Sequence, residues 1–155
     1  MTEPIPIGVL LKVCSRENEL LLSQKAEELG LTGAQLHILH FICRHSGRVV
    51  LRDIEQKFDL THATASGIIT RLETKGFIRR QEDAADRRRT VLFAEEKALF
   101  VDGQAHDFIV ANEHAMLGGF SEDETAALRA YLVRLLENLG VKPPRPRCEK
   151  EGPAC

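Results

Sequence analysis

The chain has 155 residues and a formal net charge of −2, with 43% hydrophobic and 28% charged residues. This composition is typical of one globular domain, here expected over residues 1–155, with a buried core. No apolar run approaches the ~20 residues that a membrane span requires, and the first residues lack the basic and apolar segments of a signal peptide. We therefore expect a cytoplasmic protein with no membrane partner.

The hydrophobic pattern predicts a mainly helical chain with one β-hairpin. Apolar residues at helical spacing predict helices over residues 7–29, 33–45, 51–58, 62–75, 95–117 and 122–139. Residues 77–81 and 90–94 are predicted strands, and the charged loop between them makes the hairpin a wing. Val49 and Val50 are too few for more than a stub of strand. The proline-rich tail over residues 141–155 is expected to be disordered.

Three helix starts carry sequence signals for N-terminal caps. Thr32 followed by Gln35, and Ser121 followed by Glu124, have the spacing of capping boxes. Thr61 stands directly before the fourth helix and is a favourable N-cap residue. Residues 51–77 thus form a unit of a short helix, a tight turn and a second helix, followed by the first strand of the wing.

The fourth predicted helix has two contrasting faces. Ala65, Ile68, Ile69 and Leu72 share one face, which is expected to pack inward. The opposite face and the cap carry small, hydrogen-bonding or cationic residues, namely Thr61, His62, Thr64, Ser66, Gly67, Thr70 and Arg71. A helix that enters the major groove of double-stranded DNA requires such a face. A solvated polar face is the alternative, but the position before a basic hairpin favours DNA.

Basic residues are concentrated around this helix and the wing. Residues 71–90 contain seven basic and four acidic residues, so this stretch carries 7 − 4 = +3 and the other 135 residues carry −5. A local basic region on an acidic body is compatible with nucleic-acid binding despite the negative total.

Four short motifs stand at characteristic distances along the chain, namely LTGAQ at residues 31–35, LTHATAS at 60–66, RLETKGFIRR at 71–80 and DRRR at 86–89. Together they resemble the MarR family of bacterial regulators. The resemblance covers about residues 10–139. It implies a winged helix-turn-helix over residues 33–94, in which the helix after Thr61 reads the major groove.

The resemblance also assigns roles in the wing. It implies that Arg88 is inserted into the minor groove with Asp86 bracing it, and that Arg87 and Arg89 contact phosphates. A narrow minor groove attracts an inserted guanidinium, which agrees with this assignment. A solvated charge run on an exposed loop is the alternative. Residues 94–98 depart from the Leu-Thr-x-x-Gly pattern usual in the family, so the start of the fifth helix is less defined.

The resemblance further implies a homodimer and an effector. Residues 7–29 and 95–139 would form a helical dimerisation part, and two-fold symmetry would suit a pseudo-palindromic operator. Relatives commonly release DNA when a small aromatic anion binds. The expected function is thus a transcription regulator, a repressor released by an effector, with double-stranded DNA and itself as partners.

The four cysteines raise a rival hypothesis within this class. Cys14 and Cys43 lie in apolar helical patterns and are interpreted first as small buried hydrophobic residues. Cys148 and Cys155 lie in the polar tail. A redox-sensing regulator would use Cys14, Cys43 or the tail pair, and Cys14 is the candidate that we retain.

Other function classes find little support in the sequence. It contains no nucleophile motif, glycine-rich phosphate loop or HExxH pattern, so we expect no enzymatic activity, catalytic residue or cofactor. The candidate zinc ligands are His37, His40, His106, Asp107, Glu113 and His114. The last two pairs lie roughly two helical turns apart, about 11–12 Å, which is too far for one ion. A winged helix used for protein contact would instead show apolar residues on the exposed face of the fourth helix.

Overall fold

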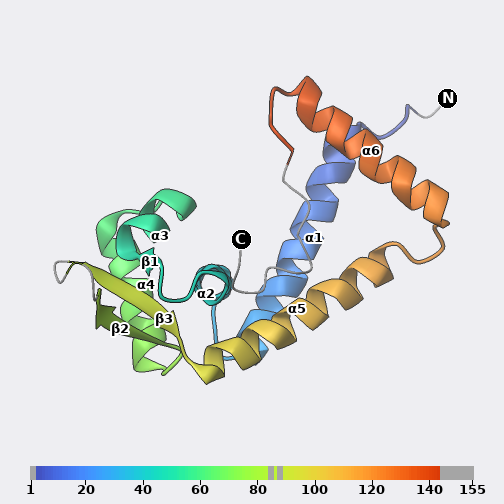
Figure 1. The fold of residues 1–155 in the computed structure, drawn as a ribbon. Coiled ribbons are helices and arrows are strands. Elements are labelled where there is room, and N and C mark those ends of the chain that lie inside the picture. The colour runs from blue at the N-terminus through green and yellow to red at the C-terminus, as the bar shows by residue number, and fades with distance from the viewer. Residues whose placement is uncertain (1–2, 84–85, 87–88, 144–155) are drawn as a thin grey trace. The chain divides into compact units, whose positions relative to one another are not determined.

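The computed structural model describes residues 3–83, 86 and 89–143. The chain divides into two compact units, Met1–Asn112 and Glu113–Cys155. The helices are α1 (Ile7–Glu28), α2 (Gly33–Arg44), α3 (Leu51–Phe58), α4 (His62–Thr74), α5 (Glu96–Met116) and α6 (Glu122–Asn138), as Figure 1 shows. The strands are β1 (Val49–Val50), β2 (Ile78–Glu82) and β3 (Thr90–Ala94). The predicted mainly α fold with a small β wing is confirmed.

The sheet is larger than the hairpin that the sequence predicted. Its strand order is β1-β3-β2, and both pairings are antiparallel. Val49 pairs with Leu92 and Val50 with Val91, so the two-residue β1 adds a third strand beside β3. A strand this short gives almost no sequence signal, because its stability depends on a partner about forty residues further along the chain.

The predicted helix caps are present. Thr32 Oγ1 accepts from the backbone N–H of Gln35 at 3.2 Å, and the backbone N–H of Thr32 donates to Gln35 Oε1 at 3.1 Å. Ser121 and Glu124 form the second capping box, and the Thr61 side chain caps α4. Each cap satisfies backbone N–H groups that have no partner inside the helix.

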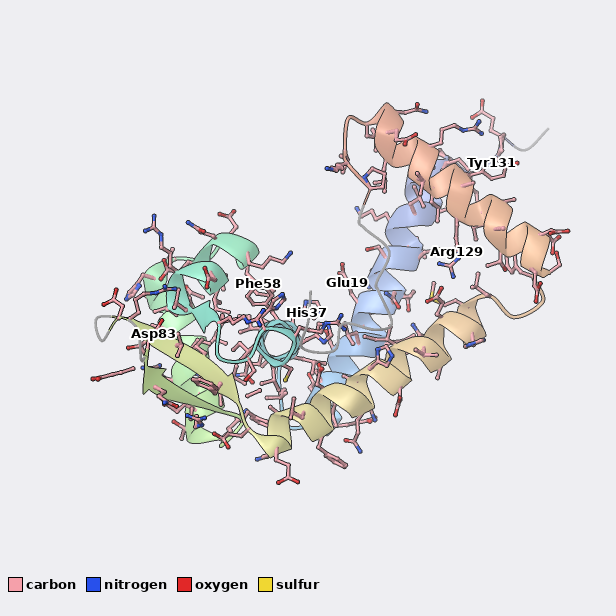
Figure 2. All side chains as sticks on the ribbon, in the orientation of Figure 1. Glu19, His37, Phe58, Asp83, Arg129 and Tyr131 are labelled. Atoms are coloured by element: carbon pink, nitrogen blue, oxygen red, sulfur yellow. The ribbon has the colours of Figure 1, made fainter. Side chains whose placement is uncertain are left out.

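The core of the first unit lies where α2 meets α3, α4 and the sheet. Its largest fully buried side chains are Ile38, Leu39, Ile42, Ile54, Ile69, Leu72 and Leu92. α2 therefore occupies the centre, although His37 on α2 is exposed (Figure 2). Ala65, Ile69 and Leu72 on α4 are buried and Ile68 is half-buried, so the inward face of α4 is confirmed.

Some predicted boundaries and environments were wrong. The strand predicted from residue 77 begins at Ile78, and Phe77 is a buried residue in the turn before it. The helix predicted from residue 95 begins at Glu96, because the carbonyl of Glu95 accepts the first helical hydrogen bond, from Ala98. Cys14 is exposed in the subunit and not buried, and Ala26 is the one residue of α1 that is buried.

Two helices bury little within the subunit. α6 has no buried residue, and Ala26 is the one buried residue of α1. In the second unit, Tyr131 on α6 is 56% exposed (Figure 2). None of the described helices is both long and apolar enough to cross a lipid bilayer.

Candidate nucleic-acid interface

A sharp turn joins α3 to α4 and positions Thr61 and His62, the first two predicted DNA-binding residues. Asp59 adopts a left-handed conformation with φ 51°, which reverses the chain sharply between the two helices. Thr61 Oγ1 accepts from the backbone N–H of Thr64 at 3.3 Å and lies 2.9 Å from Thr64 Oγ1. His62 Nδ1 lies 2.7 Å from Glu55 Oε1 on α3. The N-terminal turn of α4 is therefore held in place with its polar groups outward.

The predicted reading face of α4 is mostly open to solvent. Thr61, His62, Thr64, Thr70 and Arg71 are exposed. Ser66 and Gly67 of the same face are half-buried. The structure brings these seven residues onto one helix and its cap.

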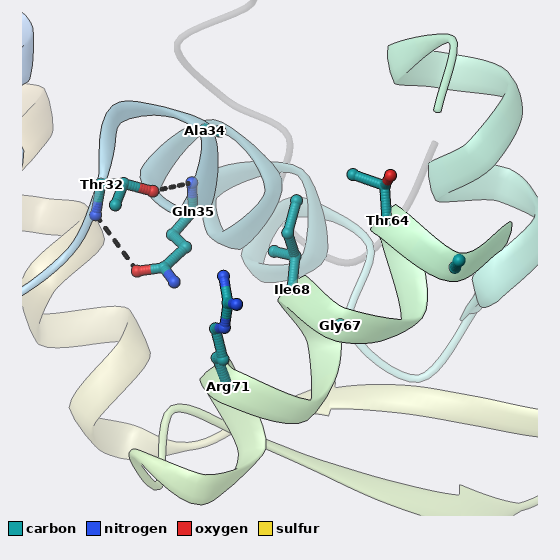
Figure 3. A pocket seen from close by; sticks show the side chains of 8 residues that line it. Thr32, Ala34, Gln35, Thr64, Gly67, Ile68 and Arg71 are labelled. Carbon is teal, nitrogen blue, oxygen red and sulfur yellow. Dashed lines mark hydrogen bonds between the residues drawn. The ribbon is translucent and has the colours of Figure 1, made fainter. Parts of the chain in front are cut away.

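A groove of about 410 Å³ runs between α4 and the start of α2, and Figure 3 shows it from close by. Its lining comprises Thr32, Ala34, Gln35, Ala63, Thr64, Gly67, Ile68 and Arg71. The Arg71 side chain reaches across it toward Gln35 (Figure 3). The sequence pattern predicted an interface role for Thr64, Gly67 and Arg71. It gave no sign that residues of α2 line a groove beside them, because a capping box by itself indicates only a helix start.

Within the part of the chain that the structure describes, Gly67 has no steric reason to be glycine. A Cβ atom built at Gly67 meets nothing within 4 Å, and its φ is not in the left-handed region. Glycine in a helix interior destabilises by roughly 0.5–1 kcal/mol relative to alanine. The chain therefore carries a stability cost at the outer face of α4 that its own packing does not require.

Two arginines of β2, the strand after α4, each have partners within the subunit. Arg79 Nε lies 3.0 Å from Glu95 Oε1, and its guanidinium lies 4.3 Å from the centre of the Phe93 ring. Arg80 lies 3.3 Å from Glu73 Oε2 and donates to Thr70 Oγ1 at 2.9 Å. Both side chains thus tie the strand β2 to its surroundings.

Arg71 differs from Arg79 and Arg80 in its lack of such partners among the described residues. Within residues 3–83, 86 and 89–143, its guanidinium makes no ion pair or hydrogen bond with another side chain or carbonyl. It is exposed and lies beside hydroxyl groups and Gly67. An unpaired guanidinium on a face of small residues has the donor geometry to contact guanine or phosphate oxygens.

The wing loop is described in part. The backbone N–H of Asp83 donates to the carbonyl of Arg89, and that of Arg89 donates to the carbonyl of Asp86, both at 2.9 Å. Arg89 Nη1 lies 4.0 Å from Asp83 Oδ2, a pairing that the sequence pattern did not indicate. Arg87 and Arg88 lie outside the described residues.

The cysteines differ in accessibility and acidity. Burial, and then the carboxylate of Asp102, raise the pKa of the half-buried Cys43 thiol to about 12. Because the thiolate is the reactive form, Cys43 is poorly suited to sense oxidants. Cys14 is exposed on α1. Cys148 and Cys155 lie outside the described residues.

The histidines considered as zinc ligands are dispersed. His40 Nδ1 lies 2.7 Å from Asp102 Oδ1 and joins α2 to α5. Among the described residues, no three His, Cys, Asp or Glu side chains gather into a group that could hold a metal ion.

Comparisons with known proteins agree with this geometry. A family profile described as "MarR family" matches residues 29–89. The crystal structure of the transcriptional regulator SlyA is 30% identical, with a TM-score of 0.68, over 86% of this chain and 93% of that chain. A crystal structure of MarR is 27% identical, with a TM-score of 0.70, over 90% of this chain and 95% of that chain.

A third structure contains nucleic acid. A single-residue mutant of S. aureus MepR bound to an oligodeoxyribonucleotide is 26% identical, with a TM-score of 0.68, over 88% of this chain and 99% of that chain. A search of curated protein sequences found no match. From the winged helix and these similarities, the chain belongs to the MarR family of winged-helix, DNA-binding transcription regulators.

Proposed function

We propose that this regulator binds a pseudo-palindromic DNA operator as a homodimer, and that α4 of each subunit reads the major groove. The observation that carries the proposal is Arg71, whose guanidinium lies on the exposed polar face of α4 and has no ion-pair partner among the described residues. Small neighbours leave room for base edges to approach, and Arg71 supplies the cation. Because the target is DNA, we expect the protein to act in the cytoplasm.

Each predicted residue has a role in this proposal. Arg71 contacts a guanine edge or a phosphate, and Gly67 allows the DNA to approach the helix closely. The remaining polar side chains of the face bind bases or phosphates, namely Thr61, His62, Thr64, Ser66 and Thr70. Thr70 is oriented by Arg80, which donates to its hydroxyl and leaves the hydroxyl proton available.

The wing provides the second set of contacts. From the family resemblance, Arg88 enters the minor groove, Asp86 orients it, and Arg87 and Arg89 bind phosphates. Arg79 does not belong to this set, because Glu95 and Phe93 already hold its guanidinium.

Homodimerisation is supported by apolar side chains that the subunit leaves exposed. On α1 and the first unit's part of α5 they are Ile7, Val9, Leu10, Leu11, Val13, Leu20, Leu21, Leu99, Phe100 and Val110. On α6 they are Tyr131, Leu132, Val133 and Leu135. Apolar surface of this extent on a single subunit marks an interaction site. Two-fold pairing would set the recognition helices about 10 base pairs apart.

We further propose that the protein is a repressor that a small aromatic effector releases, as the family resemblance implies. Oxidation of Cys14 is the alternative release signal, and its exposure on α1 supports access by an oxidant. Loss of DNA affinity after peroxide treatment, restored by dithiothreitol, would favour the cysteine. Peroxide-insensitive binding that a ligand abolishes would favour the effector.

The direct test titrates the protein into fluorescent duplexes and measures anisotropy at two salt concentrations, with unrelated DNA as competitor. The duplexes are its upstream intergenic DNA and sequences selected from a random pool. We expect tight, salt-dependent and sequence-selective binding at one dimer per site. Binding that unrelated DNA competes away equally, for every duplex, would contradict the proposal.

Three arginine variants refine this test. Arg71→Ala and Arg88→Ala should each weaken binding by about 1–3 kcal/mol, and Arg88→Ala should relax the preference at flanking A·T steps. Arg79→Ala removes the same charge from a paired position and serves as the matched control, with specificity unchanged. Equal losses in all three variants would indicate general charge attraction and not sequence reading.

A further inference from the structure

Four helix ends meet at one polar junction of the first unit. The end of α1, the start of α2, the end of α4 and the start of α5 are joined there by two lysine side chains. This junction connects the recognition helix directly to the two helices of this unit that carry exposed apolar residues.

Lys75 makes the first connection. It follows the last residue of α4, and its Nζ donates to the carbonyl of Gly30 at 2.8 Å and to Gln35 Oε1 at 3.4 Å. The Gly30 carbonyl follows the end of α1, where carbonyl groups lack helical partners and attract a cation. Gln35 is 4% exposed and is itself held by Thr32, so Lys75 contacts two rigid positions.

Lys97 makes the second connection. Its Nζ, on the first turn of α5, donates to the carbonyl of Lys75 at 2.9 Å and lies 4.4 Å from the centre of the Phe77 ring. The backbone N–H of Glu95 donates to the carbonyl of Phe77 at 2.9 Å. The end of α4 is therefore bonded to α1 through one ammonium group and to α5 through another.

We propose that Lys75 and Lys97 are positioning residues that hold the C-terminal end of α4 to α1 and α5, and so set the spacing of the two recognition helices in the dimer. The inference rests on the proposed function, in which α1 and α5 belong to the dimerisation part. If these helices are paired across the dimer, a bond from each to α4 limits how far each recognition helix can tilt. Without the bonds, α4 retains its own contacts to bases but tolerates other half-site spacings.

A phosphate contact by Lys75 would also explain a loss of affinity, and the two roles differ in what they change. Removing a phosphate contact lowers the slope of log affinity against log salt by about 1 and leaves spacing preference intact. Removing a positioning contact relaxes spacing preference and leaves the salt slope intact. Spacing preference is therefore the decisive measurement.

The experiment uses the full chain and the selected duplex from the preceding test, together with duplexes in which one base pair is inserted or removed between the half-sites. Lys75→Met and Lys97→Met remove one ammonium each while retaining the length of the side chain. Lys75→Arg restores a cationic donor. Lys25→Met is the matched control, because Lys25 also lies at the end of α1 but pairs with Glu28 of the same helix at 3.0 Å.

We expect Lys75→Met to reduce the discrimination between correct and altered spacing by about 2- to 30-fold, the range for residues that couple two sites. Lys97→Met should also reduce this discrimination. Lys75→Arg should restore most of the discrimination, and Lys25→Met should discriminate as well as the wild type. If Lys75→Met does not fold, as judged by circular dichroism, Lys97→Met provides the test.

Wild-type spacing preference in both methionine variants would overturn the inference, whether or not the salt slope changes. A wild-type protein that binds no duplex selectively would instead overturn the proposed function, and this inference with it. The two failures are distinguishable because the first requires selective wild-type binding.

Discussion

Replacing Gly67 with alanine separates the needs of the fold from those of DNA binding. In the interior of α4, alanine should raise the free energy of unfolding by about 0.5–1 kcal/mol, because glycine has more conformational freedom to lose on folding. No opposing strain is expected, since the added Cβ meets nothing within 4 Å. If DNA lies against this face, the same methyl group obstructs it, and the affinity should fall by about 1 kcal/mol or more.

Two assays measure these opposite effects. Urea denaturation followed by circular dichroism gives the unfolding free energy, at a fixed protomer concentration because dimerisation contributes to apparent stability. Anisotropy with the selected duplex gives the affinity. Gly103→Ala is the matched control, because Gly103 also lies inside a helix, α5, with nothing within 4 Å of its built Cβ. It should stabilise the protein similarly, and because α5 belongs to the proposed dimerisation part, Gly103→Ala is the control for the unfolding measurement alone.

Two results would refute this reasoning in different ways. A Gly67→Ala variant that binds DNA like the wild type would show that the DNA does not approach the helix at this position. A destabilised variant would show that the space beside Gly67 is needed by the fold.

Two further predictions concern the fold and the thiols. Gly47→Ala should destabilise by about 2–4 kcal/mol, because φ is +77° and the new Cβ would lie 2.6 Å from a ring carbon of Phe93. Gly76→Ala, at φ +73° with nothing within 4 Å of the built Cβ, should destabilise by only the cost of the left-handed backbone conformation, about 1–2 kcal/mol. Equal shifts of the urea midpoint in the two variants would contradict the steric argument. At a protein concentration low enough for the subunits to separate, a thiol reagent at pH 8 should modify Cys14 quickly and Cys43 only on unfolding, because burial and Asp102 raise the pKa of Cys43 to about 12. Mass spectrometry of peptides after timed labelling gives the order in which the two thiols react. Labelling of Cys43 before Cys14 would contradict the buried environment of Cys43.

The sequence alone was sufficient wherever one short segment contains the whole interaction. Thr32 with Gln35 and Ser121 with Glu124 form caps within four residues, and the structure has both. The inward face of α4 follows from helical periodicity, which places Ala65, Ile69 and Leu72 on one side. The family resemblance likewise depends on short motifs around α4 and the wing.

Contacts between segments that are distant in the sequence could not be predicted from short local patterns. The pairing of β1 with β3, the bond from Arg80 to Thr70 and the bond from Lys75 to Gly30 each join different elements. Nothing in the sequence near Arg79 or Arg80 distinguishes these paired arginines from Arg71, which has no ion-pair partner among the described residues. The composition of the basic region was therefore evident, but the role of each cation was not.

The sequence by itself thus determined the helices, their caps and the polar face of α4, because these depend on hydrogen bonds and periodicity over a few neighbouring residues. The tertiary structure decided which charges are already paired, where the groove beside α4 lies, and which helix ends meet at Lys75. Those features depend on how the packed elements orient long side chains toward residues that are distant in the sequence. Lys75 and Gly30, for example, are 45 residues apart. No local pattern encodes such a distance, because it is set by the sum of all core contacts.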